Sequence, residues 1–129
     1  MSLVRVPVSY GELIDKITIL EIKSERIGDP QKLTNIVREL ELLTQTWEES
    51  TARHDIADAR ARLKEINQKL WEIEDQIRLQ ESARNFDEQF IRLARDVYYT
   101  NDIRARIKKE INLALGSELV EEKSYQDYG

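Results

Sequence analysis

The residues that could best hold a ligand gather between positions 98 and 112. Residues 98–102 read YYTND and are followed by four cations, Arg104, Arg106, Lys108 and Lys109. Asparagine and aspartate favour helix starts, where unpaired N–H groups and a partial positive charge attract anions. Arg104, Lys108 and Asn112 are spaced by four and share one helix face. We therefore expect a ligand site, if present, to take an anion at Tyr99, Asn101, Asp102, Arg104, Lys108 and Asn112.

A second polar group lies near the start of the chain, at Glu12, Asp15 and Lys16. Apolar residues cover more than one face of the helix expected here, so we place this helix at the centre of the fold. Polar groups on a central helix must find partners. Asp15 and Lys16 are therefore expected to meet Asn101 and the cations of the last helix, and the group joins the candidate site.

Both groups also have a purely structural interpretation, which is the stronger one. Arg106 is spaced to pair with Asp102 and Glu110 along a helix. Cations between the isoleucines of an amphipathic helix are the side chains that such a helix turns to water. The sequence leaves two interpretations open, a solvated helix face and a ligand site, and it favours the solvated face.

Other site chemistries find no support. The chain has no cysteine, which excludes disulfides and thiolate sites. The one histidine, His54, follows Thr51 where the Glu-x-x-His pattern of di-iron bundles needs a carboxylate, and we expect it at an exposed turn. The glycines lie far apart and begin neither a phosphate loop nor a Gly-x-Ser-x-Gly motif. We expect no metal and no cofactor.

Composition indicates one all-α domain over residues 1–129. Charged residues make up 35% of the chain, while glycines and prolines number only four and two. The net charge of −5 argues against nucleic acid as a partner, because such domains normally carry a basic face. No stretch reaches the ~18 apolar residues of a membrane span, and the start lacks a signal pattern. We expect a cytoplasmic protein without membrane contact.

Hydrophobic periodicity and capping residues predict the first elements of the chain. Valines alternate between residues 4 and 8, which predicts a short extended N-terminal segment with one buried face, confined to a sheet edge by Pro7. Ser9 and Glu12 form a capping box for a first helix that ends near Ile27. Residues 28–30 read GDP and predict a left-handed stop, a new N-cap and a proline at the first helical position.

The next two helices each carry a seam, a stripe of apolar residues along which one helix packs lengthwise on another. Large apolar residues recur every three or four positions from residue 33 to residue 47. The phase breaks at residues 50–55, which are either a tight turn or a kink in one long helix. From Ile56 to Ile77, aliphatic residues fill seven successive a and d positions. This run predicts a long coiled-coil-like hairpin or a dimer seam.

Two further helices and a tail complete a predicted bundle of about five helices. Asn85 and Glu88 are spaced as a capping box, opening a helix that should turn Phe90 and Ile91 inward. The segment 100–102 then breaks the chain and begins a fifth helix, which Gly116 ends in a left-handed conformation. The tail has little periodicity, and an extended course beside residues 4–8 is one option.

Three segments resemble a family of short bacterial proteins of unknown function. They read VPVSYGELIDKITILEIK at 6–23, NDIRARIKKEIN at 101–112 and GSELVEEKSY at 116–125. The resemblance spans nearly the whole chain and implies a bacterial cytoplasmic setting. It brings no catalytic residue with it. It also implies a link to surface-polysaccharide metabolism.

Two functions remain open. The first is a non-catalytic helical interaction or assembly module, a homodimer packed helix on helix, with another protein as a further possible partner. The alternative is a binding protein or enzyme for an anionic small molecule, such as a sugar phosphate or nucleotide sugar, in the metabolism that the resemblance implies. A pocket on which the candidate side chains converge would favour the second.

Overall fold

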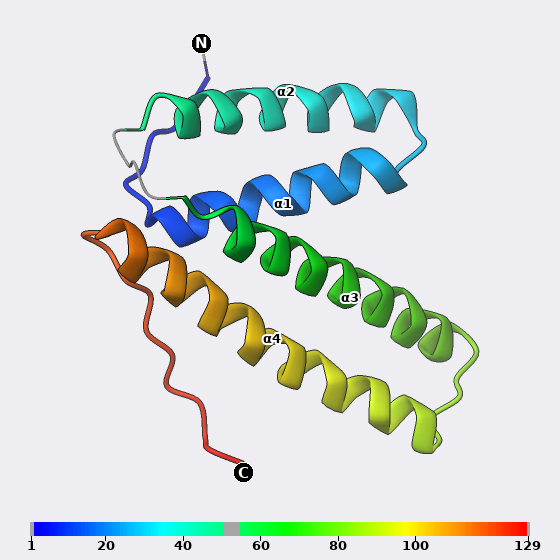
Figure 1. Ribbon diagram of the computed structural model, residues 1–129. Helices are drawn as coiled ribbons and strands as arrows, with labels where there is room; N and C mark the ends of the chain where they lie inside the picture. The colour runs from blue at the N-terminus through cyan, green and yellow to red at the C-terminus, as the bar shows by residue number, and fades with distance from the viewer. Residues whose placement is uncertain (1, 51–54, 129) are drawn as a thin grey trace.

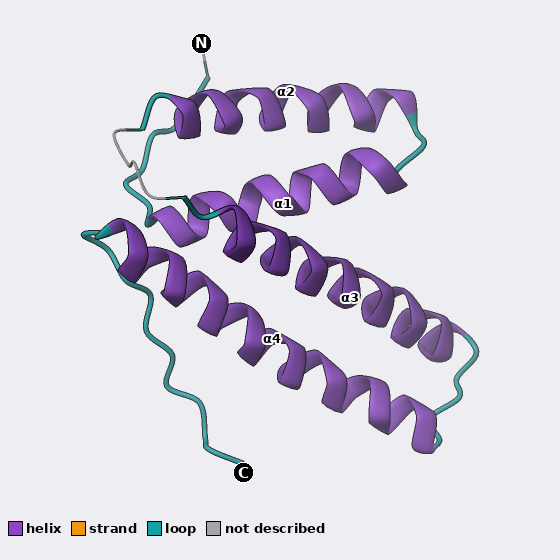
Figure 2. Ribbon diagram, viewed as in Figure 1, coloured by secondary structure: helices purple, strands orange, loops and turns teal. Residues whose placement is uncertain are grey.

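The protein is an all-helical chain in a computed structural model that describes residues 2–50 and 55–128. These described residues form four helices, α1 (Tyr10–Arg26), α2 (Pro30–Glu48), α3 (Ala57–Ser82) and α4 (Glu88–Leu115). The described residues contain no strand (Figure 2). The all-α prediction is confirmed, whereas the expected number of about five helices is wrong, because α4 is one helix where two were expected.

Helix α4 runs without a break through Thr100, Asn101 and Asp102. Residues of these types favour a helix start by only about 1 kcal/mol. Burying one aliphatic side chain contributes roughly 1.5–3 kcal/mol, and Ile107 and Ile111 further along α4 are both buried in the core. Packing therefore keeps α4 continuous. The candidate ligand residues of this segment therefore lie within a helix and not at the helix start that was expected for them.

Helix α1 is central, as its wide apolar surface predicted. It packs against α2, α3 and α4, and Figure 1 shows it between α2 and the α3–α4 pair. Ile14 and Ile17 of α1 are fully buried. Their core cluster also contains Leu13, Ile56, Leu63, Ile107 and Ile111.

Helices α3 and α4 form a long antiparallel hairpin (Figure 1), as the seam pattern predicted. The seven aliphatic seam residues between Ile56 and Ile77 are all buried or half-buried, and Leu63 is fully buried. Near the far end of the hairpin, Leu79, Phe86 and Ile91 are exposed. The inward orientation expected for Ile91 is therefore wrong, because this part of α4 packs on α3 alone.

The helices α2 and α3 are separate elements, since α2 ends at Glu48 and α3 begins at Ala57. One long kinked helix is thereby excluded. His54, expected at an exposed turn, falls in the segment 51–54, which lies outside the described residues.

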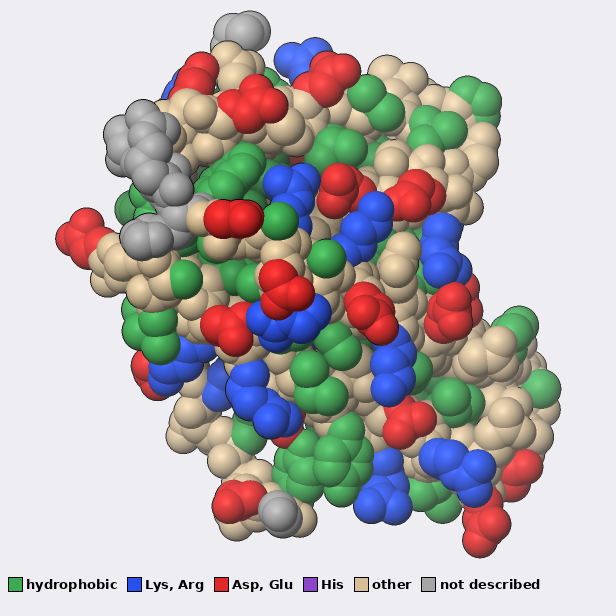
Figure 3. All heavy atoms as spheres, in the orientation of Figure 1, with side chains coloured by type: hydrophobic (Ala, Val, Ile, Leu, Met, Phe, Trp, Pro, Cys, Tyr) green, Lys and Arg blue, Asp and Glu red, His purple; other side chains and the backbone are tan. Residues whose placement is uncertain are grey.

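Ion pairs join the outer faces of the helices. Acidic and basic side chains interleave over the face drawn in Figure 3. Three pairs link α1 to α3: Lys64–Glu25 at 2.8 Å, Arg26–Glu72 at 3.0 Å and Arg60–Glu21 at 3.5 Å. Exposed pairs of this kind contribute at most about 1 kcal/mol each. The buried apolar cluster remains the main stabilising feature.

Two of the four helix starts in the described residues, those of α1 and α2, follow the local chemistry expected of them. The Ser9 Oγ accepts the N–H of Glu12 at 3.1 Å, and Asp29 caps α2 with Pro30 at the first helical turn. Helix α4 starts differently from the prediction: Asp87, and not Asn85, is its N-cap. The Asp87 carboxylate accepts the backbone N–H groups of the next helical turn, a capping role that aspartate fills well.

Two glycines were expected to end helices, and one of them does. Gly116 ends α4 with φ of 64°, a left-handed conformation. Gly28 has no positive φ, because α1 already ends at Ile27 in an extended conformation. The left-handed stop predicted at Gly28 is therefore wrong.

The two ends of the chain are irregular. Residues 2–9 have no regular secondary structure, and Val4 is 90% exposed, so the buried face and sheet edge expected here are wrong. These valines have no strand beside them to pair with in the described residues. The C-terminal tail, residues 117–128, is also irregular and runs back past α4 (Figure 1). It meets the start of the chain where the Tyr10 N–H donates to Ser117 Oγ at 3.4 Å.

Candidate functional site

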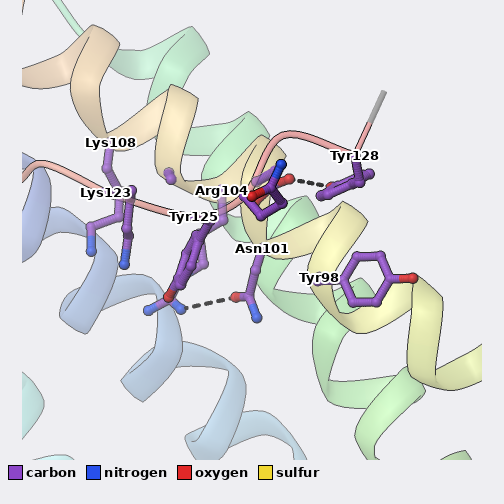
Figure 4. Close-up of a pocket in the computed structure, with 10 residues that line it drawn as sticks. Tyr98, Asn101, Arg104, Lys108, Lys123, Tyr125 and Tyr128 are labelled. Carbon is purple, nitrogen blue, oxygen red and sulfur yellow. Dashed lines mark hydrogen bonds between the residues drawn. The ribbon is translucent and has the colours of Figure 1, made fainter.

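The candidate site is a pocket of about 490 Å³ between α4 and the C-terminal tail. Figure 4 shows side chains from both segments turned toward it. Helix α4 contributes Tyr98, Asn101, Asp102, Arg104, Ala105 and Lys108. The tail contributes Lys123, Tyr125, Gln126 and Tyr128. A pocket of this size can enclose a metabolite.

Arg104 is oriented by a buried carboxylate behind it. Asp15 of α1 is 1% exposed, and its Oδ1 accepts Arg104 Nε at 2.9 Å while its Oδ2 contacts Arg104 Nη2. Asn67 of α3 donates from Nδ2 to the same Asp15 Oδ1 at 2.9 Å and to Thr18 Oγ1 at 3.0 Å. The hydrogen bonds to Asp15 raise the pKa of Arg104. Three helices thus hold this guanidinium charged and in one orientation.

Lys108 is held by carboxylates on two sides. Its Nζ lies 2.8 Å from Glu12 Oε2, 3.1 Å from Glu121 Oε2 and 3.9 Å from Asp15 Oδ2. Burial by itself lowers the pKa of Lys108, but the bonds to Glu12 and Glu121 and the charge of Asp15 outweigh it, so the pKa is raised. Lys108 is therefore a cation at neutral pH.

The close approach of α1 and α4 depends on Gly11. The Gly11 N–H donates to Asn112 Oδ1 at 2.6 Å. A Cβ at this position would overlap the backbone carbonyl oxygen of Lys108. Glycine therefore lets α1 come near enough for Glu12 and Asp15 to reach the cations of α4.

The end of the tail is fixed to α4 by Tyr128. Its hydroxyl donates to Asp102 Oδ2, and this hydrogen bond raises the pKa of Tyr128 to about 12. The Tyr128 ring also lies edge-on to Tyr98 and Tyr99, with centroids 5.2 Å and 4.9 Å away. Such aromatic contacts contribute roughly 0.5–1.5 kcal/mol each beyond simple burial.

The pocket lining is cationic although the chain is acidic. Of the residues that the structure describes, three cations and one carboxylate line it, a formal charge of +2, against −5 for the whole chain. The one carboxylate, Asp102, accepts the hydroxyl of Tyr128. Glu12 and Asp15, which neutralise the cations of α4, lie outside the lining. Since Arg104 and Lys108 are held in their charged forms, they can supply charge and hydrogen bonds to an anion.

The structure brings together part of the predicted site. Asn101, Asp102, Arg104 and Lys108 line the pocket. Glu12 and Asp15 stand behind its cations, so the expectation that Asp15 meets the cations of the last helix is confirmed, while the contact of Glu12 was not predicted.

Three predicted residues have other surroundings. Asn112 is 2% exposed and accepts the Gly11 N–H, so its contact is structural. Lys16 is exposed and pairs with Glu12 on its own helix at 3.8 Å, where a contact with α4 was expected. Tyr99 packs against Tyr128 and is not part of the lining.

Arg106 also differs from its expected pairing. Its Nε donates to the backbone carbonyl of Asp102 at 3.4 Å, while the Asp102 carboxylate accepts the hydroxyl of Tyr128. Glu110, the other expected partner, pairs with Arg62 of α3. Glu110 thus joins α4 to α3 where a pair along a single helix was predicted.

The sequence did not predict that residues of the C-terminal tail line the pocket, or that the buried Asn67 donates to Asp15. The tail has no periodicity from which its side-chain directions follow. One signal was available, since the segment 116–125 is among those that carry the family resemblance, and Lys123 and Tyr125 stand at its end. Asn67 directly follows the seam residue Ile66, a place where a polar side chain needs a buried partner.

The described residues contain no group of three or more Asp, Glu, His or Cys side chains placed to bind a metal ion. None of their helices combines the length and apolar character that crossing a membrane requires.

Neither the curated proteins nor the solved structures include a significant match to this chain. A protein-family model matches residues 4–128, which is nearly the entire sequence. The chain therefore belongs to the Family of unknown function (DUF6165).

Proposed function

We propose that the protein binds an anionic small molecule in the pocket between α4 and the C-terminal tail. The observation that carries this proposal is the set of three cations, Arg104, Lys108 and Lys123, around one pocket of an acidic chain. The bacterial, cytoplasmic setting implied by the resemblance is part of the proposal.

Preorganisation of the cations supports binding. The buried Asp15 fixes the guanidinium of Arg104, and Glu12 fixes the ammonium of Lys108 from the side of α1. Cations that are already oriented lose little side-chain freedom when an anion arrives, and this reduces the cost of binding. A chain that held these cations only for solubility would leave them extended into water.

The seam from Ile56 to Ile77 gives less support to a homodimer. Its aliphatic side chains already pack within the chain, with Ile56 and Leu63 in the same core cluster as Ile14 and Ile111. A dimer interface needs a comparable apolar surface that is free to meet a second copy. The packing of the seam within the chain therefore favours the ligand-binding hypothesis over the assembly hypothesis.

A thermal-shift and calorimetry panel tests the proposal. The probes are inorganic phosphate, pyrophosphate, adenosine monophosphate and glucuronate. We expect at least one to raise the melting temperature and to bind about tenfold more weakly to Lys123→Gln, a loss of about 1.4 kcal/mol. Lys123 is the best residue to change because it lies on the tail, away from the buried Asp15 network.

The control for this experiment is Lys69→Gln, which removes the same charge from an exposed position on α3 outside the pocket. Its affinity should equal that of the wild type within about twofold, because distant surface charges are screened. Binding of no probe, or equal weakening in both variants, would exclude the proposed site.

A further inference from the structure

Glu121 of the C-terminal tail bridges two of the pocket's cations. Its Oε1 lies 2.6 Å from Lys123 Nζ, and its Oε2 lies 3.1 Å from Lys108 Nζ. Hydrogen bonds from Lys123 and then Lys108 lower the pKa of Glu121, so the carboxylate is ionised at neutral pH. A single internal anion thus occupies both ammonium groups.

Glu121 stands beside the pocket and is not part of its lining. It lines an adjacent hollow of about 410 Å³, and the two hollows share Lys108 and Lys123. An anion inside the pocket and the Glu121 carboxylate therefore compete for the same two ammonium groups.

The opposite end of the pocket is aromatic. In Figure 4, Lys108 and Lys123 lie at one end, Tyr98 and Tyr128 at the other, and Tyr125 between them. Two side-chain amides, Asn101 and Gln126, also belong to the pocket lining. Tyrosine rings offer flat apolar faces and polar edges, and amides both donate and accept hydrogen bonds. This end suits a ring that carries polar groups.

We propose that Glu121 holds the place of the ligand's anionic group, and that the ligand is a polar ring compound bearing one carboxylate or phosphate. The inference rests on the proposed function above. When the ligand binds, its anion replaces Glu121 at Lys108 and Lys123, so both ammonium groups keep an anionic partner. The Glu121 side chain, 41% exposed, then turns to water. The tail remains attached through Tyr128 and Asp102.

The decisive variant is Glu121→Gln, tested against Glu122→Gln. Both substitutions remove one negative charge from adjacent tail positions, but Glu122 pairs with Lys109, outside the pocket, at 3.4 Å. We expect adenosine monophosphate or glucuronate to bind Glu121→Gln about tenfold more tightly than the wild type, because the internal competitor has lost its charge. Glu122→Gln should differ from the wild type by about twofold at most, since exposed charges are screened at physiological salt.

Neutral and ring-free probes complete the experiment. Adenosine and glucose lack the anion and should show no tighter binding to Glu121→Gln. Inorganic phosphate lacks the ring and should bind less tightly than adenosine monophosphate. Comparison of adenosine monophosphate with glucuronate separates a phosphate ligand from a carboxylate ligand.

The outcomes distinguish this inference from the proposed function. Equal tightening in Glu121→Gln and Glu122→Gln would be a general charge effect and would overturn the inference. If a probe binds the wild type in a Lys123-dependent manner but not more tightly to Glu121→Gln, the inference fails and the proposed function stands. If no probe binds either the wild type or Glu121→Gln, both fail.

Discussion

At the scale of single residues, the site is governed by carboxylates that sit behind its functional groups. Asp15 is almost completely buried, and its charge is tolerated because Arg104 and Asn67 both donate to it. Removing one partner of such a pair typically costs 3–5 kcal/mol. A substitution of Arg104 would therefore change both the stability of the fold and the charge of the pocket. A substitution of Lys123 leaves the hydrogen bonds of Asp15 in place, so it tests ligand binding more directly.

The hydrogen bond from Tyr128 to Asp102 predicts an unusual titration. The pKa of Tyr128 is raised from 10.0 to about 12, so the folded protein favours the protonated hydroxyl. The stabilising effect of this bond is fully present below pH 10.0 and is lost as the pH rises through about 12. The difference in tyrosinate absorbance between wild type and Tyr128→Phe should follow this high pKa. In an Asp102→Asn background, the absorbance change assigned to Tyr128 should report a pKa closer to 10.0. An unchanged titration curve would contradict the hydrogen bond.

At the scale of elements, the site depends on how closely α1 approaches α4. Gly11 provides that approach, since its backbone N–H bonds to Asn112 and its missing side chain leaves room for the carbonyl of Lys108. The carboxylates of Glu12 and Asp15 lie on the same helix within the next turn. The position of the pocket cations therefore follows from a helix-to-helix contact and not from α4 alone.

Gly11→Ala should destabilise the protein although alanine is the better helix former. Alanine gains at most about 1 kcal/mol of helix propensity over glycine. Its Cβ would meet the backbone carbonyl of Lys108, which cannot rotate away, and overpacking of this kind costs roughly 1–3 kcal/mol. We expect a net loss in the free energy of unfolding, measured by urea denaturation. Gly28→Ala is the matched control: its Cβ meets nothing within 4 Å, so a loss equal to that of Gly11→Ala would refute the explanation.

At the scale of the whole molecule, α1 is the element around which the others assemble. The α3–α4 hairpin packs on it from one side and α2 from the other (Figure 1). The apolar cluster is concentrated where the hairpin meets α1, while the far end of the hairpin exposes Leu79 and Phe86. Stability should therefore be unevenly distributed along α3.

Two truncations within α3 test this distribution. Leu63→Ala removes a fully buried side chain and should lower the free energy of unfolding by about 2–5 kcal/mol. Leu79→Ala changes a residue that is 61% exposed and should alter it by about 0.5 kcal/mol or less. If the seam is satisfied within one chain, the urea midpoint of the wild type will not depend on protein concentration. A midpoint that rises with concentration and loses this dependence in Leu63→Ala would instead identify an interchain seam.

Local sequence signals predicted the elements better than their connections. The capping residues Ser9 and Asp29 and the left-handed Gly116 were correctly placed, because each acts on backbone groups within a few residues. The same local reasoning failed at residues 100–102, where a weak preference for a helix start is outweighed by the burial of Ile107 and Ile111.

Spacing along one chain reports which face of a helix is apolar, so the periodicity was enough to predict a helical chain, a central first helix and lengthwise pairing of the segment 56–77 with another helix. A contact of Asp15 with some cation of the last helix was also expected, but the folded chain was needed to single out Arg104 and to show that the tail closes a pocket over α4. These contacts join residues far apart in sequence, and they depend on the distance between helices and on an irregular tail. No periodic pattern encodes either of these, so the helices were predictable and the pocket was not.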